Sequence, residues 1–373
     1  MLTPGDEREL AEAVAGAAGP LRVTGGGTRA VGVTEAGEVL STAGLRGIGL
    51  YEPGALTIVA KAGTPLAEVE AALAAERQRL PFEPMDHRPL LGTEGAPTIG
   101  GLVAANVSGP RRVQAGACRD SLIGVRFVDG TGTVLKNGGR VMKNVTGYDL
   151  VKLMAGSFGT LGILTEVAFK VLPETATQAT LSLRGLDTGC ATGAMSAALT
   201  SPFEVTGAAH GAWDGEAATL IRIEGFEASV EYRAARLREL LAPFGEVEVV
   251  RDPGRVAAVW RGVRDVAPFA GREGDVWRFS VRPSDAPALV AAVAPAECLL
   301  DWGGGLVWAL APEGTDLRAR MSTPGHATLV RAAHGTKRAL KVFHPEPAPL
   351  AAIAEGLRRK FDPRGILNPG LMG

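Results

Sequence analysis

The sequence has few of the features that mark several common classes of protein. It holds three cysteines, Cys118, Cys190 and Cys298, which are far apart and form no C-x-x-C pair. This spacing gives no support to a disulfide framework, a zinc site or an iron–sulfur cluster, so we expect three small buried side chains and no metal site. No apolar run approaches the ~20 residues that a membrane-spanning helix requires, so no direct membrane insertion is expected.

Positive charge is not in excess either, because 39 lysines and arginines are balanced by 40 acidic residues in a chain of 373. A protein that binds nucleic acid by neutralising phosphates usually carries a basic surplus, which makes nucleic acid an unexpected partner. The acidic opening sequence MLTPGDERELAEAV has the character of neither a signal peptide nor a transit peptide. A cytoplasmic protein is therefore the expectation.

Glycine, by contrast, is abundant, with 50 residues. Much of it falls in three segments of the first half: TGGGT at 24–28, PTIGGLVAANVSGP at 97–110 and VTGYDLVKLMAGSFGTLGILTE at 145–166. Because glycine lacks a Cβ atom and accepts positive φ, consecutive N–H groups can converge on an anion at close range. The three segments together predict a site for one long, doubly charged ligand that bears phosphate.

Hydrophobic periodicity predicts an α+β fold. Up to Pro173 we expect a helix opened by Thr3 and Pro4, strands over 21–23, 38–42, 57–62 and 162–172, a helix after Pro65, and a hairpin over 125–136. The strands at 38–42 and 57–62 are expected to flank a turn at 52–54. Further strands are predicted over 179–183, 218–224, 275–281, 305–310 and 326–331, with helices at 228–241 and from 348. The chain is accordingly divided into residues 1–173, 174–340 and 341–373.

The spacing Gly25-x-Gly27-x-x-Ala30 also matches the dinucleotide-binding pattern of a Rossmann unit. That unit requires a helix directly after the glycines and an acidic residue about twenty positions later. The sequence that follows here, VGVTEAGEVLSTAGLRG, has no helical spacing and no acid near position 45. A nicotinamide site is therefore disfavoured, and a tight turn without a ligand remains the alternative for this loop taken alone.

The segments TGGGTR, TIGGLVAANVSGPRR, GRVMKNVTGYDLVKLMAGSFGTLGILTEV and FDPRGILNPG together resemble the FAD-binding fold of the vanillyl-alcohol oxidase (PCMH-type) flavoproteins. More narrowly, the chain resembles the family of FAD-binding E subunits of bacterial glycolate oxidase, which WRFSV at 277–281, DWGGGLVWA at 301–309 and GHATLVRA at 325–332 also match. The resemblance implies a two-subdomain FAD-binding domain over 1–173, an α+β cap domain over 174–340, and a tail over 341–373 that closes on the FAD domain.

The same resemblance implies which residues contact FAD. The diphosphate is expected on Gly25, Gly26, Gly27 and Thr28, and on Thr98, Ile99, Gly100 and Gly101, where Thr98 caps a helix whose free N–H groups point at phosphate. Ala105, Asn106 and Gly109 would follow the ribityl chain, Gly147, Tyr148, Asp149, Gly159, Gly162 and Ile163 would edge the adenosine and the flavin ring, and Asn368 would close over the flavin.

Several of these residues have plainer alternatives. Tyr148 can be a core tyrosine, Asp149 a helix cap, and Asn368 part of an Asn-Pro turn. Covalent flavoproteins of the superfamily carry a histidine in or near the phosphate loop, and there is none between Leu21 and Glu83. The FAD is therefore predicted to be non-covalent.

Oxidation of a 2-hydroxy acid needs a base for the hydroxyl proton and a cation for the carboxylate. The chain lacks the H-G-D-G-N-x-H motif of catalytic relatives, and its five histidines show no metal spacing. The remaining candidates are His326 as the base and Arg278 and Arg331 as the carboxylate clamp, with ordinary surface or core roles as the alternatives. In a regular strand His326 and Arg331 would point to opposite faces.

Three hypotheses follow, and the missing histidine motif favours the first. The chain is an FAD-carrying subunit of a glycolate oxidase complex, with a larger catalytic flavoprotein subunit and an iron–sulfur subunit as partners, through which any membrane association would arise. Alternatively, it is a free-standing FAD-dependent dehydrogenase acting on a small 2-hydroxy acid. The third and weakest hypothesis is a flavin-free scaffold in the same complex.

Overall fold

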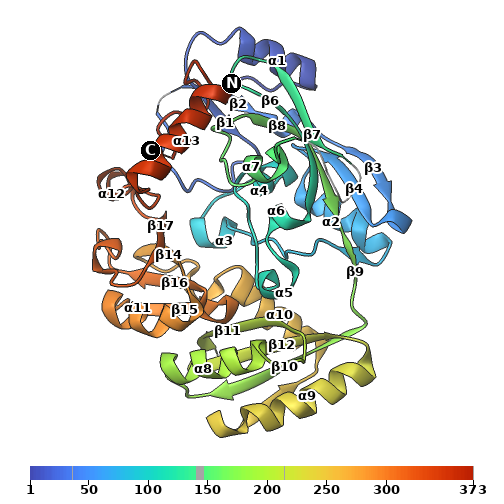
Figure 1. Cartoon of the computed structure of the whole chain (residues 1–373), viewed down its shortest axis with the longest axis vertical. Helices are drawn as coiled ribbons and strands as arrows, with labels where there is room; N and C mark the ends of the chain where they lie inside the picture. Colours follow the sequence, from blue (N-terminus) through green and yellow to red (C-terminus); the bar gives the residue numbers. More distant parts are fainter. Residues whose placement is uncertain (36, 140–146, 214, 373) are drawn as a thin grey trace.

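Two antiparallel β-sheets, one near each end of the long axis, organise the chain in this computed structural model (Figure 1). The structure describes residues 1–35, 37–139, 147–213 and 215–372, so residues 140–146 of the GRVMKNVTGYD motif lie outside the described residues. Both termini lie on the part of the molecule built around the first sheet (Figure 1).

The first sheet has five strands in the order β3 (Ile48–Glu52), β4 (Thr57–Lys61), β8 (Ile163–Lys170), β6 (Leu122–Val128) and β7 (Val134–Gly138). The predicted hairpin is confirmed as β6 and β7, and its turn is fixed by Asp129, whose side chain accepts hydrogen bonds from the N–H groups of Thr131 (2.8 Å) and Thr133 (3.0 Å). Alternation along β6 and β8 buries Phe127 and Leu164 in one apolar cluster, and Val128 and Ile163 in another.

Helices and a small parallel sheet complete this half of the molecule. α2 (Leu66–Ala75), α4 (Ile99–Ala104) and α7 (Leu150–Met154) share the first cluster, whereas α1 (Glu7–Ala15) shares the second with β1 (Leu21–Thr24) and β2 (Glu38–Ser41). Short elements fill the connections: β5 (Gln78–Arg79), α3 (Arg88–Leu91), α5 (Arg112–Ala115), α6 (Cys118–Ser121) and β9 (Leu172–Pro173).

Two details of the prediction are wrong here. β2 does not flank a turn with β4, because it pairs in parallel with β1, while β4 pairs with β3, a strand that the sequence did not reveal. β3 is only partly buried and therefore lacks a clear apolar alternation. α1 begins at Glu7 rather than at Thr3, since Asp6 supplies the cap by accepting a hydrogen bond from the N–H of Glu9.

The second sheet has eight strands in the order β13 (Val247–Val250), β10 (Thr177–Arg184), β12 (Glu216–Gly225), β11 (Val205–Trp213), β15 (Glu297–Asp301), β16 (Leu306–Ala311), β14 (Asp275–Val281) and β17 (Gly325–Arg331). The five strands predicted here are confirmed. β11, β13 and β15 were not anticipated; β11, VTGAAHGAW, is rich in small residues that carry little strand signal.

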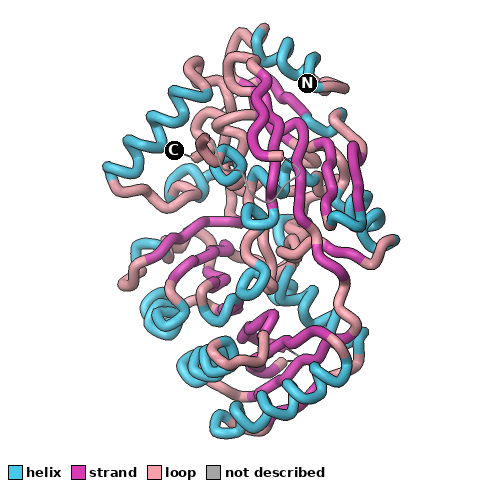
Figure 2. Tube along the Cα trace, turned by 45° about the vertical axis from the view of Figure 1, so that its right-hand side comes forward, coloured by secondary structure: helices cyan, strands magenta, loops and turns pink. Residues whose placement is uncertain are grey.

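Helices cover one face of the eight-stranded sheet, as Figure 2 shows at the end of the molecule that holds α9. α8 (Thr188–Leu199), α9 (Glu227–Leu241) and α11 (Ala286–Val293) share one buried cluster with that face. On the opposite face α10 (Pro253–Arg264) covers β11 and β12, while Trp308 of β16 and Val330 of β17 join the core of the first sheet. The two sheets therefore share a continuous apolar core at their junction.

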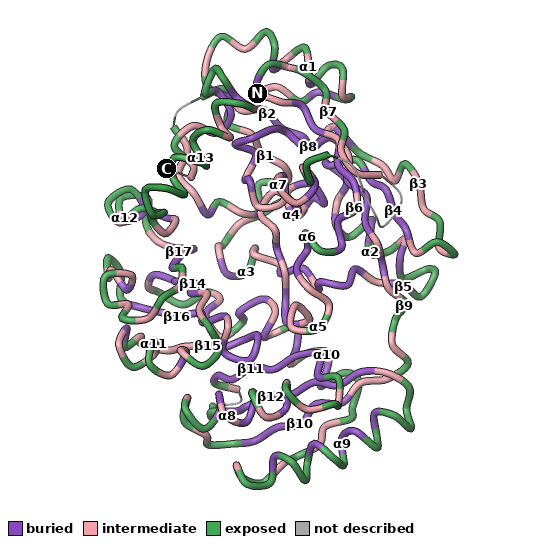
Figure 3. Tube along the Cα trace, in the orientation of Figure 1, coloured by how far each residue is buried: buried purple, intermediate pink, exposed green. Residues whose placement is uncertain are grey.

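The tail returns to the first sheet after α12 (His334–Leu340) and α13 (Ala348–Phe361). The N–H of Leu21 donates to the carbonyl of Ile366 (2.7 Å), and the N–H of Asn368 donates to the carbonyl of Leu21 (3.0 Å). Strands of both sheets are largely buried, whereas α13 is mostly exposed (Figure 3). Two cysteines depart from the expected burial, because Cys118 is buried but Cys190 is exposed and Cys298 is intermediate.

Candidate functional site

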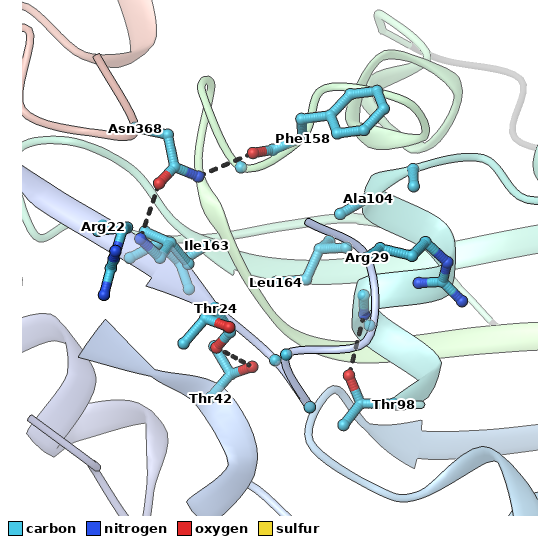
Figure 4. A pocket seen from close by; sticks show the side chains of 18 of the residues that line it. Arg22, Thr24, Arg29, Thr42, Thr98, Ala104, Phe158, Ile163, Leu164 and Asn368 are labelled. Atoms are coloured by element: carbon cyan, nitrogen blue, oxygen red, sulfur yellow. Dashed lines mark hydrogen bonds between the residues drawn. The ribbon is translucent and has the colours of Figure 1, made fainter. Parts of the chain in front are cut away.

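A cavity of about 360 Å³ opens where the loop after β1, the start of α4, the segment before β8 and the tail meet (Figure 4). This volume lies within the range of small-molecule and cofactor sites. Twelve of the predicted cofactor residues line it: Gly25, Gly26, Gly27, Thr28, Thr98, Gly100, Gly101, Ala105, Gly159, Gly162, Ile163 and Asn368. The structure thus brings residues from three glycine segments and the tail to one place.

The glycines of the 24–28 loop are needed for different reasons. A Cβ atom on Gly26 would lie 1.6 Å from the carbonyl oxygen of Ala96, and one on Gly25 would lie 2.5 Å from the hydroxyl of Thr98. Gly27 has φ +71° and open space where its Cβ would stand. The first two glycines therefore permit close packing against 96–98, whereas Gly27 provides a left-handed backbone conformation beside the cavity.

Backbone N–H groups of this loop are free donors beside the cavity. Within the described residues, no hydrogen-bond acceptor pairs with the backbone N–H of Gly26, Gly27 or Thr28. Consecutive N–H groups that face a cavity without partners favour an anionic ligand. This geometry is what a diphosphate would require.

The start of α4 differs from the expectation of free N–H groups. Thr98 does cap the helix, because its hydroxyl accepts from the N–H of Gly101 (3.3 Å). The N–H groups of Ile99 and Gly100, however, donate to the carbonyls of Thr64 (3.0 Å) and Ala62 (2.8 Å). The prediction that this helix end aims free N–H groups at phosphate is therefore wrong, and Gly100 instead permits close packing against Ala62.

The tail is fixed to the cavity wall by Asn368, which is 3% exposed. Its Oδ1 accepts from the N–H of Val23 (2.7 Å) and its Nδ2 donates to the carbonyl of Phe158 (2.9 Å), as Figure 4 shows. With φ +46°, Asn368 also adopts a left-handed conformation that asparagine tolerates better than most residues. Asn368 thus holds three segments together and also lines the cavity.

Six predicted cofactor residues do not line the cavity: Ile99, Asn106, Gly109, Gly147, Tyr148 and Asp149. Ile99 is fully buried, and Asn106 accepts from the N–H of Arg119 (3.1 Å). Tyr148 is 88% exposed, so its alternative as a core tyrosine is wrong. Asp149 caps α7 by accepting from the N–H of Lys152 (3.1 Å), and Gly147 beside it is exposed. Contacts of these six with FAD stay predictions.

Sequence reasoning missed other lining residues, among them Arg22, Thr24, Arg29, Thr42, Ala62, Phe158 and Leu371. Arg29 and Thr24 directly flank the glycine run, which could have suggested them. Thr42 and Ala62 carry no sequence signal, because they reach the cavity only through the pairing of β2 and the position of the segment after β4.

The three catalytic candidates have very different surroundings. The guanidinium of Arg331 donates to backbone carbonyls of Gly274, Leu90, Phe269 and Arg272 at 2.7–3.3 Å, which occupies it fully. Its role as a carboxylate clamp therefore has no geometric support. His326 is exposed, with its ring 5.5 Å from that of His344, and neither lines the cavity.

Arg278 lies at the junction of the two sheets, with its guanidinium carbon 5.4 Å from the ring of Trp302 and 6.0 Å from that of Trp308. Burial, and then the nearby charge of Arg112, lower the pKa of Arg278 to about 10. Burial likewise lowers the pKa of Arg29 to about 10. Among the described residues, no group of histidine, cysteine and acidic side chains could hold a metal ion.

Comparison with known proteins agrees with this geometry. The family profile of an FAD binding domain matches residues 1–138. The glycolate oxidase subunit GlcE of Escherichia coli (strain K12) is 40% identical over 358 residues, which cover 95% of this chain and 92% of that protein. The glycolate oxidase subunit GlcD of Bacillus subtilis (strain 168) is 44% identical over 84 residues, or 22% of this chain and 18% of the relative.

Solved structures show the same fold at low sequence identity. A chitooligosaccharide oxidase aligns with a TM-score of 0.67 and 16% identity, and the alignment covers 99% of this chain and 90% of the oxidase chain. An alkyldihydroxyacetonephosphate synthase aligns with a TM-score of 0.67 and 15% identity, and the alignment covers 98% of this chain and 76% of the synthase chain. The described residues contain no helix long and apolar enough to cross a membrane.

The family profile and the relatives define an FAD-dependent oxidoreductase, and the solved structures show its PCMH-type FAD-binding fold of the α+β class. Identity over nearly the whole length narrows this class further. The chain belongs to the family of glycolate oxidase GlcE subunits.

Proposed function

We propose that this chain carries non-covalent FAD in the glycine-lined cavity and contributes flavin redox chemistry to the oxidation of glycolate to glyoxylate within a multisubunit glycolate oxidase. The observation that carries the proposal is the run of unpaired N–H groups at Gly26, Gly27 and Thr28 beside the cavity. These groups would hold the diphosphate, and residues 1–173, 174–340 and 341–373 would act as FAD domain, cap domain and closing tail.

Non-covalent binding is supported by the surroundings of His87. Its Nδ1 accepts a hydrogen bond from Nε of Arg29 (3.2 Å), and the residue does not line the cavity. When bound, the flavin would supply the hydride acceptor, while the protein would position the cofactor and exclude water. Asn368, Gly159 and Gly162 would hold the wall that faces the cofactor.

The proposed partners are a larger flavoprotein subunit and an iron–sulfur subunit that accepts electrons. Two relatives of this chain are named as glycolate oxidase subunits, GlcE and GlcD, and such names imply an enzyme of several subunits. The complex would act in the cytoplasm or, through its other subunits, at a membrane.

A second candidate function is supported by Arg278 and Arg112, two partly buried cations beside the ring of Trp302 that could bind a substrate directly. In this case the chain would be a free-standing FAD-dependent 2-hydroxy-acid dehydrogenase. His326 would not supply the base, because it is exposed and away from the cavity. His326→Ala is therefore expected to leave flavin content unchanged.

The experiment that separates the candidates is an assay of the purified chain with glycolate and D-lactate in the presence of a dye acceptor, alone and after co-expression with the larger flavoprotein subunit. The proposed function predicts a yellow chain that is inert alone and active in the complex. Rapid dye reduction by the chain alone would support the second candidate. A colourless chain that binds no flavin would contradict both and support a scaffold.

A further inference from the structure

A buried lysine connects the second half of the chain to the glycine loop at 24–28. Lys337 lies on α12, the helix that follows β17 of the eight-stranded sheet, and it is 9% exposed. Its Nζ donates a hydrogen bond to the carbonyl of Ala30 (2.9 Å). Ala30 lines the cavity and follows Thr28 by two positions. The side chain of Lys337 therefore reaches from the second sheet to the end of the glycine loop.

The residues after the glycine loop also pack against the second half of the chain. Val31 is 7% exposed and belongs to one buried apolar cluster with Val330 of β17 and with Val342, which follows α12. Within the first half, the hydroxyl of Thr93 donates to the carbonyl of Thr28 (3.0 Å). The backbone over 28–31 is therefore held by both halves of the molecule.

The ammonium group of Lys337 has no carboxylate partner. Within the described residues it makes the one hydrogen bond to Ala30 and no ion pair. Burial lowers the pKa of Lys337, and the charge of Asp275 offsets this only in part. Arg222, which is also buried, differs because it donates to both carboxylate oxygens of Glu83 at 3.0 and 2.9 Å. A buried cation that lacks such a partner favours an anion close by.

A diphosphate in the cavity would lie within range of this charge. Consecutive Cα atoms are about 3.8 Å apart, so those of Thr28 and Ala30 are separated by at most about 7.6 Å. The unpaired N–H groups of Gly26, Gly27 and Thr28 belong to the same stretch of backbone. Because salt screens charges over about 10 Å at 0.1 M, the ammonium would attract an anion held by these N–H groups.

We propose that Lys337 is a positioning residue for the cofactor. By holding the carbonyl of Ala30 it fixes the glycine loop in the conformation that binds diphosphate, and its positive charge attracts that diphosphate. The inference rests on the proposed function, which places FAD in the cavity. Lys337 itself does not line the cavity, so it acts through the loop and couples the position of α12 to the affinity for FAD.

The test is titration of the flavin-free chain, prepared by dialysis against potassium bromide, with FAD at about 50 mM and at about 1 M sodium chloride. Lys337→Met has an apolar side chain of similar length, and its Kd for FAD should be raised at least tenfold at the lower salt concentration. At the higher concentration the difference should shrink to less than about threefold, because the Debye length falls to about 3 Å. Lys337→Arg, which keeps the charge, should lie between the natural chain and Lys337→Met.

The matched control is Lys360→Met, which removes the same charge at an exposed lysine of α13 and should change Kd less than twofold. Urea unfolding of the flavin-free chains separates positioning from a structural role. Replacing buried charges by apolar side chains of similar volume is often neutral or stabilising. The urea midpoint of Lys337→Met should therefore equal or exceed that of the natural chain, although its FAD affinity falls.

Two results would overturn the inference and leave the proposed FAD site intact. One is an unchanged Kd for FAD in Lys337→Met. The other is a loss of affinity that is equal at both salt concentrations and is accompanied by a lower urea midpoint. A natural chain that binds no FAD would contradict the proposed function itself, and this inference with it.

Discussion

At the scale of single residues, a substitution at Gly27 can distinguish an effect on cofactor binding from an effect on the stability of the fold. Gly26→Val would be ambiguous, because its side chain meets the carbonyl of Ala96 whether or not a ligand is present. Gly27 and Gly185 both have φ +71° and open space at the Cβ position, but only Gly27 lines the cavity. They form a matched pair.

We predict that Gly27→Ala and Gly185→Ala each destabilise the fold by about 1–2 kcal/mol, the cost of a left-handed conformation. Only Gly27→Ala should weaken FAD binding, by at least tenfold, because its methyl group enters the space of the diphosphate. Flavin fluorescence titration of both variants measures this. The same FAD affinity in the two would mean that the loop does not contact the cofactor.

Asp301 gives a prediction on pH. Burial raises the pKa of Asp301 from 3.8 to about 7, with Glu83 raising it further and the N–H of Trp302, Arg222 and Arg278 lowering it. In the unfolded chain the carboxyl ionises near pH 4, so the native state alone holds this proton between about pH 4 and 7. The native state should therefore lose stability as the pH rises through this range.

Asp301→Asn removes the titration and keeps an acceptor for the N–H of Trp302, which Oδ1 now binds at 2.7 Å. Relative to the natural chain, the variant should gain up to about 4 kcal/mol of unfolding free energy between pH 4 and pH 7, and no more above pH 7. Urea unfolding at four pH values checks this. A difference that does not vary with pH would show that Asp301 is ionised throughout.

At the scale of elements, Asn368 joins the tail to β1 and to the segment before β8. Asn368→Ala would leave the N–H of Val23 and the carbonyl of Phe158 without partners in a site that is 3% exposed. Each unsatisfied buried group costs about 1–3 kcal/mol. We predict a lower Tm and release of the tail, seen as faster amide exchange at 21–24. Unchanged exchange would mean that the tail is held elsewhere.

Elements with strong local signals were predictable, and elements defined by pairing were not. The β6 and β7 hairpin and α9 follow from turn chemistry and from periodicity. The parallel pairing of β1 with β2 and the strands β3 and β11 depend on contacts distant in sequence, which no local pattern encodes.

The candidate site shows the same division. The three glycine segments gave eleven of the twelve predicted lining residues and the tail gave Asn368, whereas Thr42 and Ala62 reach the cavity only through the pairing of strands distant in sequence.

At the scale of the whole molecule, buried charges connect the two sheets. Glu224 of β12 accepts from Arg79 (3.0 Å) and from Arg111 (2.6 Å), and both arginines belong to the first half of the chain. Although burial alone would raise it, hydrogen bonding to Arg111 and the charges of Arg222, Arg111 and Arg79 hold the pKa of Glu224 well below its usual range. The Glu224 carboxylate thus connects the two halves of the chain through ion pairs.

Removing that charge should uncouple the halves. Glu224→Gln leaves the largely buried guanidinium of Arg79 without its anion and leaves Arg111 with Glu83 alone (3.6 Å), at a cost of about 3–5 kcal/mol. Glu204→Gln is the control. Glu204 forms an ion pair with Arg233, but its side chain is 75% exposed, so this ion pair should contribute less than about 1 kcal/mol to stability. Urea midpoints compare the two. Equal midpoints would show that the network does not hold the sheets together.

The most direct measurement for the central claim is the flavin content of the purified chain before and after acid precipitation. The account predicts one FAD per chain in the native protein, with all of the flavin released into the supernatant by acid. A chain that binds no FAD on titration, or one whose flavin stays with the precipitate, would contradict it.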